Sequence, residues 1–365
     1  MISAACSAML AGCTVQPSSE PELIKYSNIA VDAGFDTPFI YTEYGTDHDL
    51  MAEHFAAGTG IWTTYNNLFD IYNDYEGINN LKTVNDNAGI APVKVDRAVI
   101  DLLKTAKEFY DLSGGEFDIT QGSLLHVWHE YRENGIALNE KNEPAPVPTE
   151  AELQEAASHS GWEYIEIDEE NSTVFITEKG VSLDVGGIAK GFTAEAIGST
   201  TENDAVYGIV DAGRNIRTMH DKADGTPWRV GVQNPSGEGS LFIVEMSGSC
   251  SAVTSGDYER FYTGEDGKRY SHIIDPDTMY PAVLYHSVTI LTPDSAAADC
   301  LSTTLFTLSV EEGKKVLAEY EKRSGKPASA VWITDPDQTQ GTDGVSAGGY
   351  HVCYTEDLAE RIFFQ

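Results

Sequence analysis

The chain has 365 residues, 41% of them hydrophobic, so it can bury a sizeable core, and its composition argues against wholesale disorder. With 58 acidic and 23 basic residues, it has a formal net charge of −35. Such a surface repels nucleic acid and anionic lipid headgroups, so we expect no nucleic acid partner, and the charge of any phosphate ligand has to be neutralised locally by a metal ion, a lysine or backbone N–H groups.

The first residues are typical of an export signal. Ile2–Ala11 is apolar, and Leu10–Cys13 resembles a bacterial lipobox, in which cleavage precedes the cysteine and the thiol is lipidated. No Lys or Arg precedes the apolar stretch, and an ordinary apolar segment is the alternative. We expect residues 1–13 to be a signal peptide, 14–35 a tether and 36–365 the folded domain of an extracytoplasmic lipoprotein, anchored by lipid to the bacterial cell membrane.

The N-terminal half of the folded region is predicted to be mostly helical. Asp96 is placed to cap a helix that ends at Gly114, and Thr149 is placed to cap another. Alternation and helical spacing predict these elements in chain order: a strand over 38–44 and helices over 49–74, 96–110, from 122 onward and after 149.

The C-terminal half is predicted to mix strands with helices. Two alternating segments flank a turn at 169–172, which indicates a hairpin. Because helices and strands interleave without a strict βαβ order, we expect an α+β fold with mixed sheets and packed helices. The predicted strands are 164–168, 173–177, 182–185, 206–210, 228–233, 241–246, 270–274, 287–291, 328–334 and 351–354, and the predicted helices are 189–197, 296–308 and 310–324.

Three cysteines remain if Cys13 is lipidated. Cys250, Cys300 and Cys353 cannot all pair, and their spacing fits no zinc site. We expect them to be small buried hydrophobic residues.

Residues 184–191 (Asp-Val-Gly-Gly-Ile-Ala-Lys-Gly) place two glycines between a predicted strand and a predicted helix. Glycines let the backbone approach a ligand closely, and the free N–H groups at a helix start favour an anion. Lys190 lies about one turn into the helix, where it can reach a phosphate or a ribose. The alternative is a plain strand–turn–helix connection. The spacing is not that of a Walker loop.

Asp299 and Thr303 are four residues apart, so they share one face of the predicted helix, with Ser302 beside them. A carboxylate with hydroxyl oxygens suits Mg²⁺, which shares its coordination sphere with substrate phosphates. An N-capping Asp with two solvated hydroxyls is the alternative, but the apolar residues on both sides favour burial of the Asp299 face.

His272 lies near the end of a predicted strand, before a turn at Asp275-Pro276. A histidine there can act as a base with a pKa near neutrality, and a core histidine with satisfied nitrogens is the alternative. Residues 254–260 (Thr-Ser-Gly-Asp-Tyr-Glu-Arg) combine hydroxyls at a predicted glycine turn with a Glu-Arg pair, which is more often structural than catalytic.

Together these motifs resemble those of the ApbE family of FAD:protein FMN transferases. The resemblance covers nearly all of the chain after the lipobox and depends on the order and spacing of its motifs. They are 184–191, 211–216 (Asp-Ala-Gly-Arg-Asn-Ile), 254–262, 272–281 and 299–306, with 76–81, 114–118 and 122–132 in the N-terminal half.

The resemblance implies a magnesium-dependent transfer. FAD would bind with its pyrophosphate on Mg²⁺, a Thr or Ser hydroxyl of an acceptor protein would attack the FMN phosphorus, and AMP would leave. Two other activities remain open: an Mg²⁺-dependent FAD pyrophosphatase, in which water replaces the hydroxyl, and a non-catalytic flavin-binding lipoprotein. A candidate base at His272 argues against the pure binder.

The resemblance also implies roles for individual residues. His272 would be the catalytic base. The metal ligands would be Gly187, through its carbonyl, with Asp299, Ser302 and Thr303. The FAD contacts would be Tyr44, Tyr72, Glu116, Phe117, Asp118, Asp184, Lys190 and Val288.

One departure from the family pattern bears on the shape of the site. Where the family has Thr-Gly after the histidine motif, this chain has Thr278-Met279. Because Met279 replaces a flexible glycine, the shape of this loop is the least predictable part of the motif.

Overall fold

The computed structural model describes residues 23–202, 206–237 and 239–365. The predicted signal peptide over 1–13 and the predicted tether up to residue 22 lie outside these residues. Within the described chain, no helix is long and apolar enough to cross a membrane.

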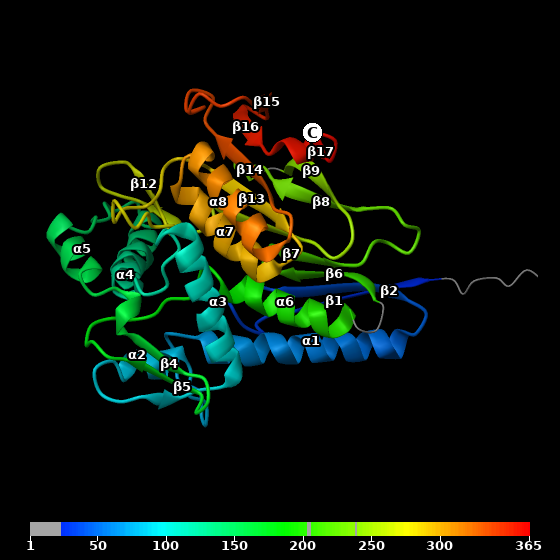
Figure 1. Cartoon of the computed structure of the whole chain (residues 1–365). Coiled ribbons are helices and arrows are strands. Elements are labelled where there is room, and N and C mark those ends of the chain that lie inside the picture. The colour runs from blue at the N-terminus through cyan, green and yellow to red at the C-terminus, as the bar shows by residue number, and fades with distance from the viewer. Residues whose placement is uncertain (1–22, 203–205, 238) are drawn as a thin grey trace, which may run out of the picture.

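A nine-stranded antiparallel sheet forms the centre of the molecule (Figure 1). Its inner strands β13 and β14 are buried on both faces, because helices cover one side and a smaller sheet the other. In spatial order the strands are β1 (Ile24–Ala30), β2 (Phe39–Gly45), β6 (Tyr207–Ala212), β7 (Asn215–Met219), β10 (Ser251–Gly256), β13 (Ser287–Thr292), β14 (Ser329–Thr334), β16 (Tyr350–Tyr354) and β15 (Val345–Ala347).

The predicted tether over 14–35 is wrong in its second half, because Ile24–Ala30 form the edge strand β1. This strand pairs with β2 along its whole length, from Ile24 opposite Gly45 to Ala30 opposite Phe39. Most of its side chains are exposed. The strand therefore has no buried face that a hydrophobic pattern could reveal, and its backbone pairing with β2 holds it in place.

Four helices lie on the sheet or on one another. They are α1 (His48–Phe69), α6 (Ala189–Glu202), α7 (Ser295–Thr307) and α8 (Val310–Ser324), and α1 runs beside α6 (Figure 1). Helix α7 lies against α6, β10 and β13. Eleven of its thirteen residues are buried, which leaves Thr303 and Thr307 as the positions with access to the surface.

Smaller elements surround this centre. One end of the molecule contains four helices and a three-stranded sheet (Figure 1). The helices are α2 (Leu81–Asp86), α3 (Arg97–Ser113), α4 (Gly122–Asn139) and α5 (Glu150–Ala157). That sheet consists of β3 (Val93–Lys94), β5 (Thr173–Ile176) and β4 (Ile165–Asp168). The other small sheets are β17 (Ile362–Phe364) with β9 (Ser240–Met246) and β8 (Trp228–Gln233), and the pair β11 (Phe261–Thr263) and β12 (Arg269–Ser271).

The predicted α+β class is confirmed, as are several local signals. Asp96 accepts the Ala98 N–H at the start of α3, which ends at Gly114 in the left-handed conformation. Thr149 and Glu152 form a capping box at α5. Cys300 and Cys353 are buried and Cys250 is half-buried, all as free thiols.

Two local predictions were wrong. Residues 182–185 do not form a strand, since only Ser182 makes an isolated bridge, to Gln121. The glycine turn predicted at 254–256 is instead the end of β10, and the turn begins at Asp257. Both segments contact residues that are distant in sequence: Ser182 pairs with Gln121, and β10 pairs with β7 and β13. Their conformation therefore depends on these partners.

Candidate active site

The glycine-rich segment 184–191 and helix α7 lie in direct contact. The backbone N–H of Gly191, in the first turn of α6, donates a hydrogen bond to Asp299 Oδ2 at 2.8 Å. A Cβ on Gly191 would overlap the carbonyl oxygen of Ser295 and would lie 2.6 Å from the Cβ of Asp299. Only glycine allows the two helices to approach so closely.

Gly187 is the second contact between these segments. A Cβ placed on Gly187 would lie 3.3 Å from Thr303 Oγ1 and 3.0 Å from the ring of Phe117. The backbone of the glycine turn therefore lies next to the surface-accessible hydroxyl of α7. Gly187, Asp299 and Thr303, which the sequence grouped only by motif, are neighbours in the structure.

Asp299 is a carboxyl group with little access to water. Its side chain is buried, and this burial raises its pKa, while the positive charge of Lys190 and the hydrogen bond from Gly191 act in the opposite direction. A buried carboxylate is stable when cationic charge compensates it. Lys190 supplies part of that charge, and a divalent cation would supply more.

The oxygen set at this point suits magnesium rather than a softer metal. No group of three or more His, Cys, Asp or Glu side chains in the described part of the chain is arranged to hold a metal ion. One carboxylate, one hydroxyl and a backbone carbonyl form an incomplete set of hard ligands. Mg²⁺ commonly binds to such a set because it keeps waters and takes further oxygens from substrate phosphates.

Ser302 is held differently from Thr303. It is fully buried, its hydroxyl lies 2.8 Å from Ser255 Oγ on β10, and it donates to the carbonyl of Asp299 at 2.9 Å. These bonds join α7 to the sheet. The predicted role of Ser302 as a metal ligand stays a prediction.

Asp184 is held at the start of the glycine turn by its backbone and its side chain. Its N–H donates to the Ile119 carbonyl and its Oδ1 accepts the Gly186 N–H, both at 2.8 Å. Asn85 on α2 supports the preceding residue, Leu183, by two hydrogen bonds of 2.8 and 3.0 Å. Burial raises the pKa of Asp184, and the hydrogen bond from Gly186 and the charge of Arg132 oppose this.

The segment Glu116–Asp118 lies against the same turn. The ring of Phe117 covers Gly187, as described above, and its N–H donates to Ser113 Oγ at 3.0 Å. Glu116 accepts a 2.9 Å hydrogen bond from Thr307, the other surface-accessible residue of α7. Burial raises the pKa of both Glu116 and Asp118. The structure thus places Phe117 at the glycine turn, Glu116 at Thr307 of α7, and Asp118 next to Ile119, whose carbonyl accepts the N–H of Asp184.

His272 follows β12 and lies among positive charges. Burial lowers its pKa to about 3, helped by the charges of Arg132, Arg260 and Lys190. The ring hydrogen-bonds to the Arg260 backbone, while Nδ1 is buried and has no hydrogen-bond partner. The predicted pKa near neutrality is therefore wrong, because burial and the neighbouring positive charges keep His272 neutral; its imidazole still has a lone pair that can accept a proton.

The three remaining predicted FAD contacts have different surroundings. Tyr72 is half-exposed and stacks on His129, with ring centroids 4.8 Å apart, within the electrostatic range of Asp184. Val288 is fully buried in β13 between Ser255 and Trp332, so its side chain faces the core.

Tyr44 is the predicted contact that the structure separates from the cluster. It packs against Trp228 and pairs with Tyr207, five positions along β2 from Phe39. Across the sheet, Phe39 lies opposite Ala212, and Ala212 lies opposite Asn215, which is a neighbour of Asp299. These three residues form a row that leads to the site. At about 3.4 Å per residue, Tyr44 lies roughly 17 Å from that row.

The sequence reasoning missed several residues of this cluster. Arg132 and His129 were part of a quoted motif without a role, Arg260 was placed in a structural pair with Glu259, and Asn85 was not considered. Glu259 in fact forms an ion pair with Arg214. Arg260 therefore does not pair with Glu259, and its positive charge acts on His272. The sequence did contain one signal for these residues, since arginines inside the motifs of a strongly acidic chain indicate a local need for positive charge.

Met279 adopts a left-handed backbone conformation, with φ of 65°. The loop thus keeps a conformation that glycine accommodates most easily, although the residue is methionine. Its carbonyl accepts a 2.8 Å hydrogen bond from Trp128 Nε1 of α4, which attaches this loop to the helix that carries Arg132.

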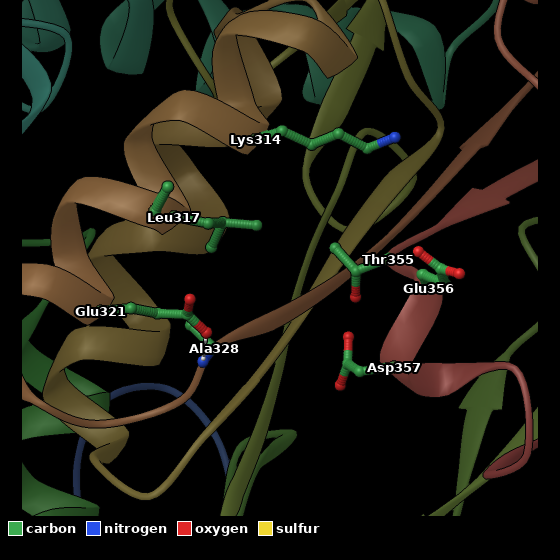
Figure 2. A pocket seen from close by; sticks show the side chains of 8 residues that line it. Lys314, Leu317, Glu321, Ala328, Thr355, Glu356 and Asp357 are labelled. Carbon is green, nitrogen blue, oxygen red and sulfur yellow. Dashed lines mark hydrogen bonds between the residues drawn. The ribbon is translucent and has the colours of Figure 1, made fainter.

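A cavity of about 540 Å³ lies elsewhere, between α8 and the residues after β16 (Figure 2). Its lining includes Glu321, Glu356 and Asp357 against a single lysine, Lys314. Such a lining repels phosphate groups, and none of the candidate residues belongs to it. The candidate site therefore lies away from this cavity, at the contact between the glycine turn and α7.

Sequence comparison relates this chain to a known family. The profile of the ApbE family matches residues 40–325. An FAD:protein FMN transferase of Treponema pallidum (strain Nichols) is 36% identical over 256 residues, which are 66% of this chain and 68% of the relative. One from Klebsiella pneumoniae (strain 342) is 29% identical over 303 residues, 81% of this chain and 86% of the relative.

Solved structures show the same architecture. The crystal structure of the ApbE protein from Thermotoga maritima matches with a TM-score of 0.75 and 27% identity, covering 94% of this chain and 100% of the other. The flavin transferase ApbE from Vibrio cholerae matches with a TM-score of 0.72, covering 93% and 100% of the two chains. At 22% identity, this second likeness shows the fold alone.

Proposed function

Because the chain belongs to the ApbE family, we propose that it is an FAD:protein FMN transferase, which moves FMN from FAD to a Thr or Ser hydroxyl of an acceptor protein and releases AMP. The observation that carries the proposal is the packing of the glycine turn against α7, through the contact between Gly191 and Asp299. It joins an anion-binding backbone to a buried carboxylate and a free hydroxyl in one place.

We propose that Mg²⁺ is held by Asp299, Thr303 and the backbone carbonyl of Gly187. The buried carboxylate and the adjacent hydroxyl fit this ion, as argued above. When bound, the ion would neutralise the pyrophosphate of FAD and polarise the phosphorus under attack. The other steps depend on side chains of the chain itself.

In this scheme His272 is the general base. The acceptor oxygen forms a bond to the FMN phosphorus while its proton passes to the neutral imidazole. The bond from that phosphorus to the bridging oxygen breaks, and AMP leaves with the bridging oxygen. Phosphoryl-type transfer depends mainly on positioning and charge neutralisation, which a rigid contact between α6 and α7 supports.

Binding of FAD would involve the groups that surround the glycine turn. Lys190 would neutralise phosphate charge, the segment Glu116–Asp118 would contact the adenosine end, and Tyr72 offers an exposed ring beside Asp184. The contacts proposed for Tyr44 and Val288 have less support, because Tyr44 lies away from the cluster and the side chain of Val288 is buried in the sheet.

The test incubates the protein with FAD and Mg²⁺, with and without an acceptor protein that carries an exposed target threonine. Flavin fluorescence of the acceptor band after denaturing electrophoresis supports the transferase, and a Thr→Ala variant of the acceptor is the matched control. Release of free FMN regardless of acceptor supports the pyrophosphatase, and intact bound FAD supports a binding protein. Chelation by EDTA followed by readdition of Mg²⁺ tests the metal separately.

We further propose that the protein is a lipoprotein anchored outside the cytoplasm. The lipobox-like Leu10–Cys13 in the sequence supports this. Cys13→Ala should move the protein from the membrane fraction to the soluble extracytoplasmic fraction. An unchanged membrane fraction would contradict the anchor while leaving the enzymatic proposal intact.

A further inference from the structure

Three cationic side chains lie within electrostatic range of His272: Arg132 of α4, Lys190 of α6 and Arg260 of the turn after β10. We call them the basic cluster. The charges of all three act on the histidine ring, and Arg132 and Arg260 also act on each other. The chain has 58 acidic residues against 23 basic ones, so three cations around one point are a local exception. Mutual repulsion makes such a group unfavourable without an anion.

The protein itself balances the positive charge of this cluster only in part. Among the residues that the structure describes, no ion pair includes Lys190 or Arg260. Arg132 reaches only Glu133, at 3.9 Å, and the side chain of that glutamate is largely exposed. Asp184 acts on Arg132 electrostatically. Asp299 likewise acts on Lys190, so Glu133, Asp184 and Asp299 offset part of the positive charge, and Arg260 has no ion-pair partner among the described residues.

Arg132 is built into the fold rather than lying on the surface. Its side chain is 8% exposed, and Nε is buried without a hydrogen-bond partner. Beside it, Nδ1 of His272 is likewise buried and without a partner. Buried polar atoms are almost always hydrogen-bonded, so two orphaned nitrogens around one cationic point indicate a polar ligand.

The orientation of Arg132 is set from its other side. Its Nη2 lies 3.0 Å from His129 Nδ1, and His129 is stacked on Tyr72. Burial and the charge of Arg132 lower the pKa of His129, which keeps that ring neutral and able to accept the guanidinium hydrogen. Nη2 of the guanidinium is thus fixed, while Nε on the same edge has no hydrogen-bond partner.

We propose that Arg132 and Arg260 bind the phosphate of the FMN half of the dinucleotide and hold its phosphorus beside His272. The proposal rests on the proposed function, since it assigns the anion that this reaction brings to the site. A guanidinium offers paired N–H donors that match two phosphate oxygens. A lysine would supply the same charge without this paired geometry, which explains why arginine is found here. An acidic segment of the acceptor protein is the competing anion.

The test compares FMN with riboflavin, which is the same ring system without the phosphate. Binding of each is measured by quenching of flavin fluorescence, without Mg²⁺ or acceptor, on the full chain. The wild type should bind FMN more tightly than riboflavin. Arg132→Gln should reduce that preference by about tenfold or more, with riboflavin affinity unchanged, because a charge-assisted hydrogen bond is lost. Arg132→Lys should restore it in part.

Arg260→Gln is the second variant. Its side chain is exposed, so this protein should fold even if the Arg132 variant does not. Arg97→Gln, on the exposed face of α3, is the matched control and should keep the wild-type preference.

The proposal is overturned if Arg132→Gln and Arg260→Gln both keep the wild-type preference for FMN, or lose riboflavin binding equally. An unchanged preference with a raised KM for the acceptor would assign the arginines to the acceptor instead. The proposed function fails separately, if the wild type selects FMN through these arginines yet never modifies an acceptor.

Discussion

Gly191 and Asp299, 108 residues apart in the sequence, are joined by a 2.8 Å hydrogen bond from a backbone N–H to a carboxylate oxygen. The bond connects the first turn of α6 to the middle of α7. It also directs a buried negative charge toward the glycine turn. The proposed metal site therefore depends on how closely two helices pack, and this dependence can be tested.

Gly191→Ala should damage both stability and transfer. The added methyl group would overlap the Ser295 carbonyl, and backbone cannot move aside as a flexible side chain can. We expect a loss of about 1–3 kcal/mol in the free energy of unfolding, measured by urea denaturation, together with loss of flavin transfer. Gly60→Ala is the matched control. No atom lies within 4 Å of its Cβ position in α1, so it should gain about 0.5–1 kcal/mol.

Asp299→Asn should separate function from folding. The amide oxygen can still accept the Gly191 N–H, and losing the buried charge removes its desolvation cost, so thermal unfolding without Mg²⁺ should show no destabilisation. Transfer should fall at least about 100-fold, because a bound metal contributes several kcal/mol. Asp294→Asn, at the cap of the same helix, should keep full activity. Wild-type activity in Asp299→Asn would remove the metal assignment.

His272→Gln should reduce the rate of transfer by roughly 10²–10⁴-fold, because glutamine cannot act as a general base. FAD affinity, measured by fluorescence quenching, should stay near that of the wild type. If affinity fell while the turnover of bound FAD persisted, His272 would be a binding residue instead.

The same variant provides a pH test of stability. The pKa of His272 is about 3 in the folded state and 6.5 in its ordinary state, so below pH 6.5 the unfolded chain binds a proton that the folded chain does not. This lowers wild-type stability as the pH falls. The free energy of unfolding of the wild type minus that of His272→Gln should therefore decrease from pH 7 to pH 5, by at most about 1.4 kcal/mol per pH unit. A constant difference would show an ordinary pKa.

Met279 offers a test of the loop after the histidine. Its left-handed backbone costs a non-glycine residue about 1–2 kcal/mol, and a β-branched residue more. Met279→Gly relieves this strain but loses packing in a buried cluster, so its stability should stay close to that of the wild type. Met279→Val should be destabilised by about 1 kcal/mol or more in urea denaturation. Equal stability of the two variants would contradict the strain.

The comparison of sequence with structure shows where local reasoning succeeds. Helix starts at Asp96 and Thr149 were predictable because a cap depends on the next two or three residues. The grouping of Gly187 with Asp299 and Thr303 followed from the family motifs, and in the structure Gly187 lies against Thr303 while Gly191 is hydrogen-bonded to Asp299.

Errors arose where distant segments determine the conformation. Strand β1 has no buried face of its own and forms because β2 offers it a backbone edge. Tyr44 follows the expected strand pattern and packs against Trp228, and its predicted contact with FAD stays a prediction. Arg132 is part of a helix whose pattern says nothing about its partners.

The amino-acid sequence by itself determined the α+β class, most helix positions and the family, because these depend on local pattern and on motif order. Only the tertiary structure decided which oxygens meet at Asp299 and which arginines surround His272. Those contacts join residues from five separate segments, and their energies come from burial and charge, which exist only after the chain has packed.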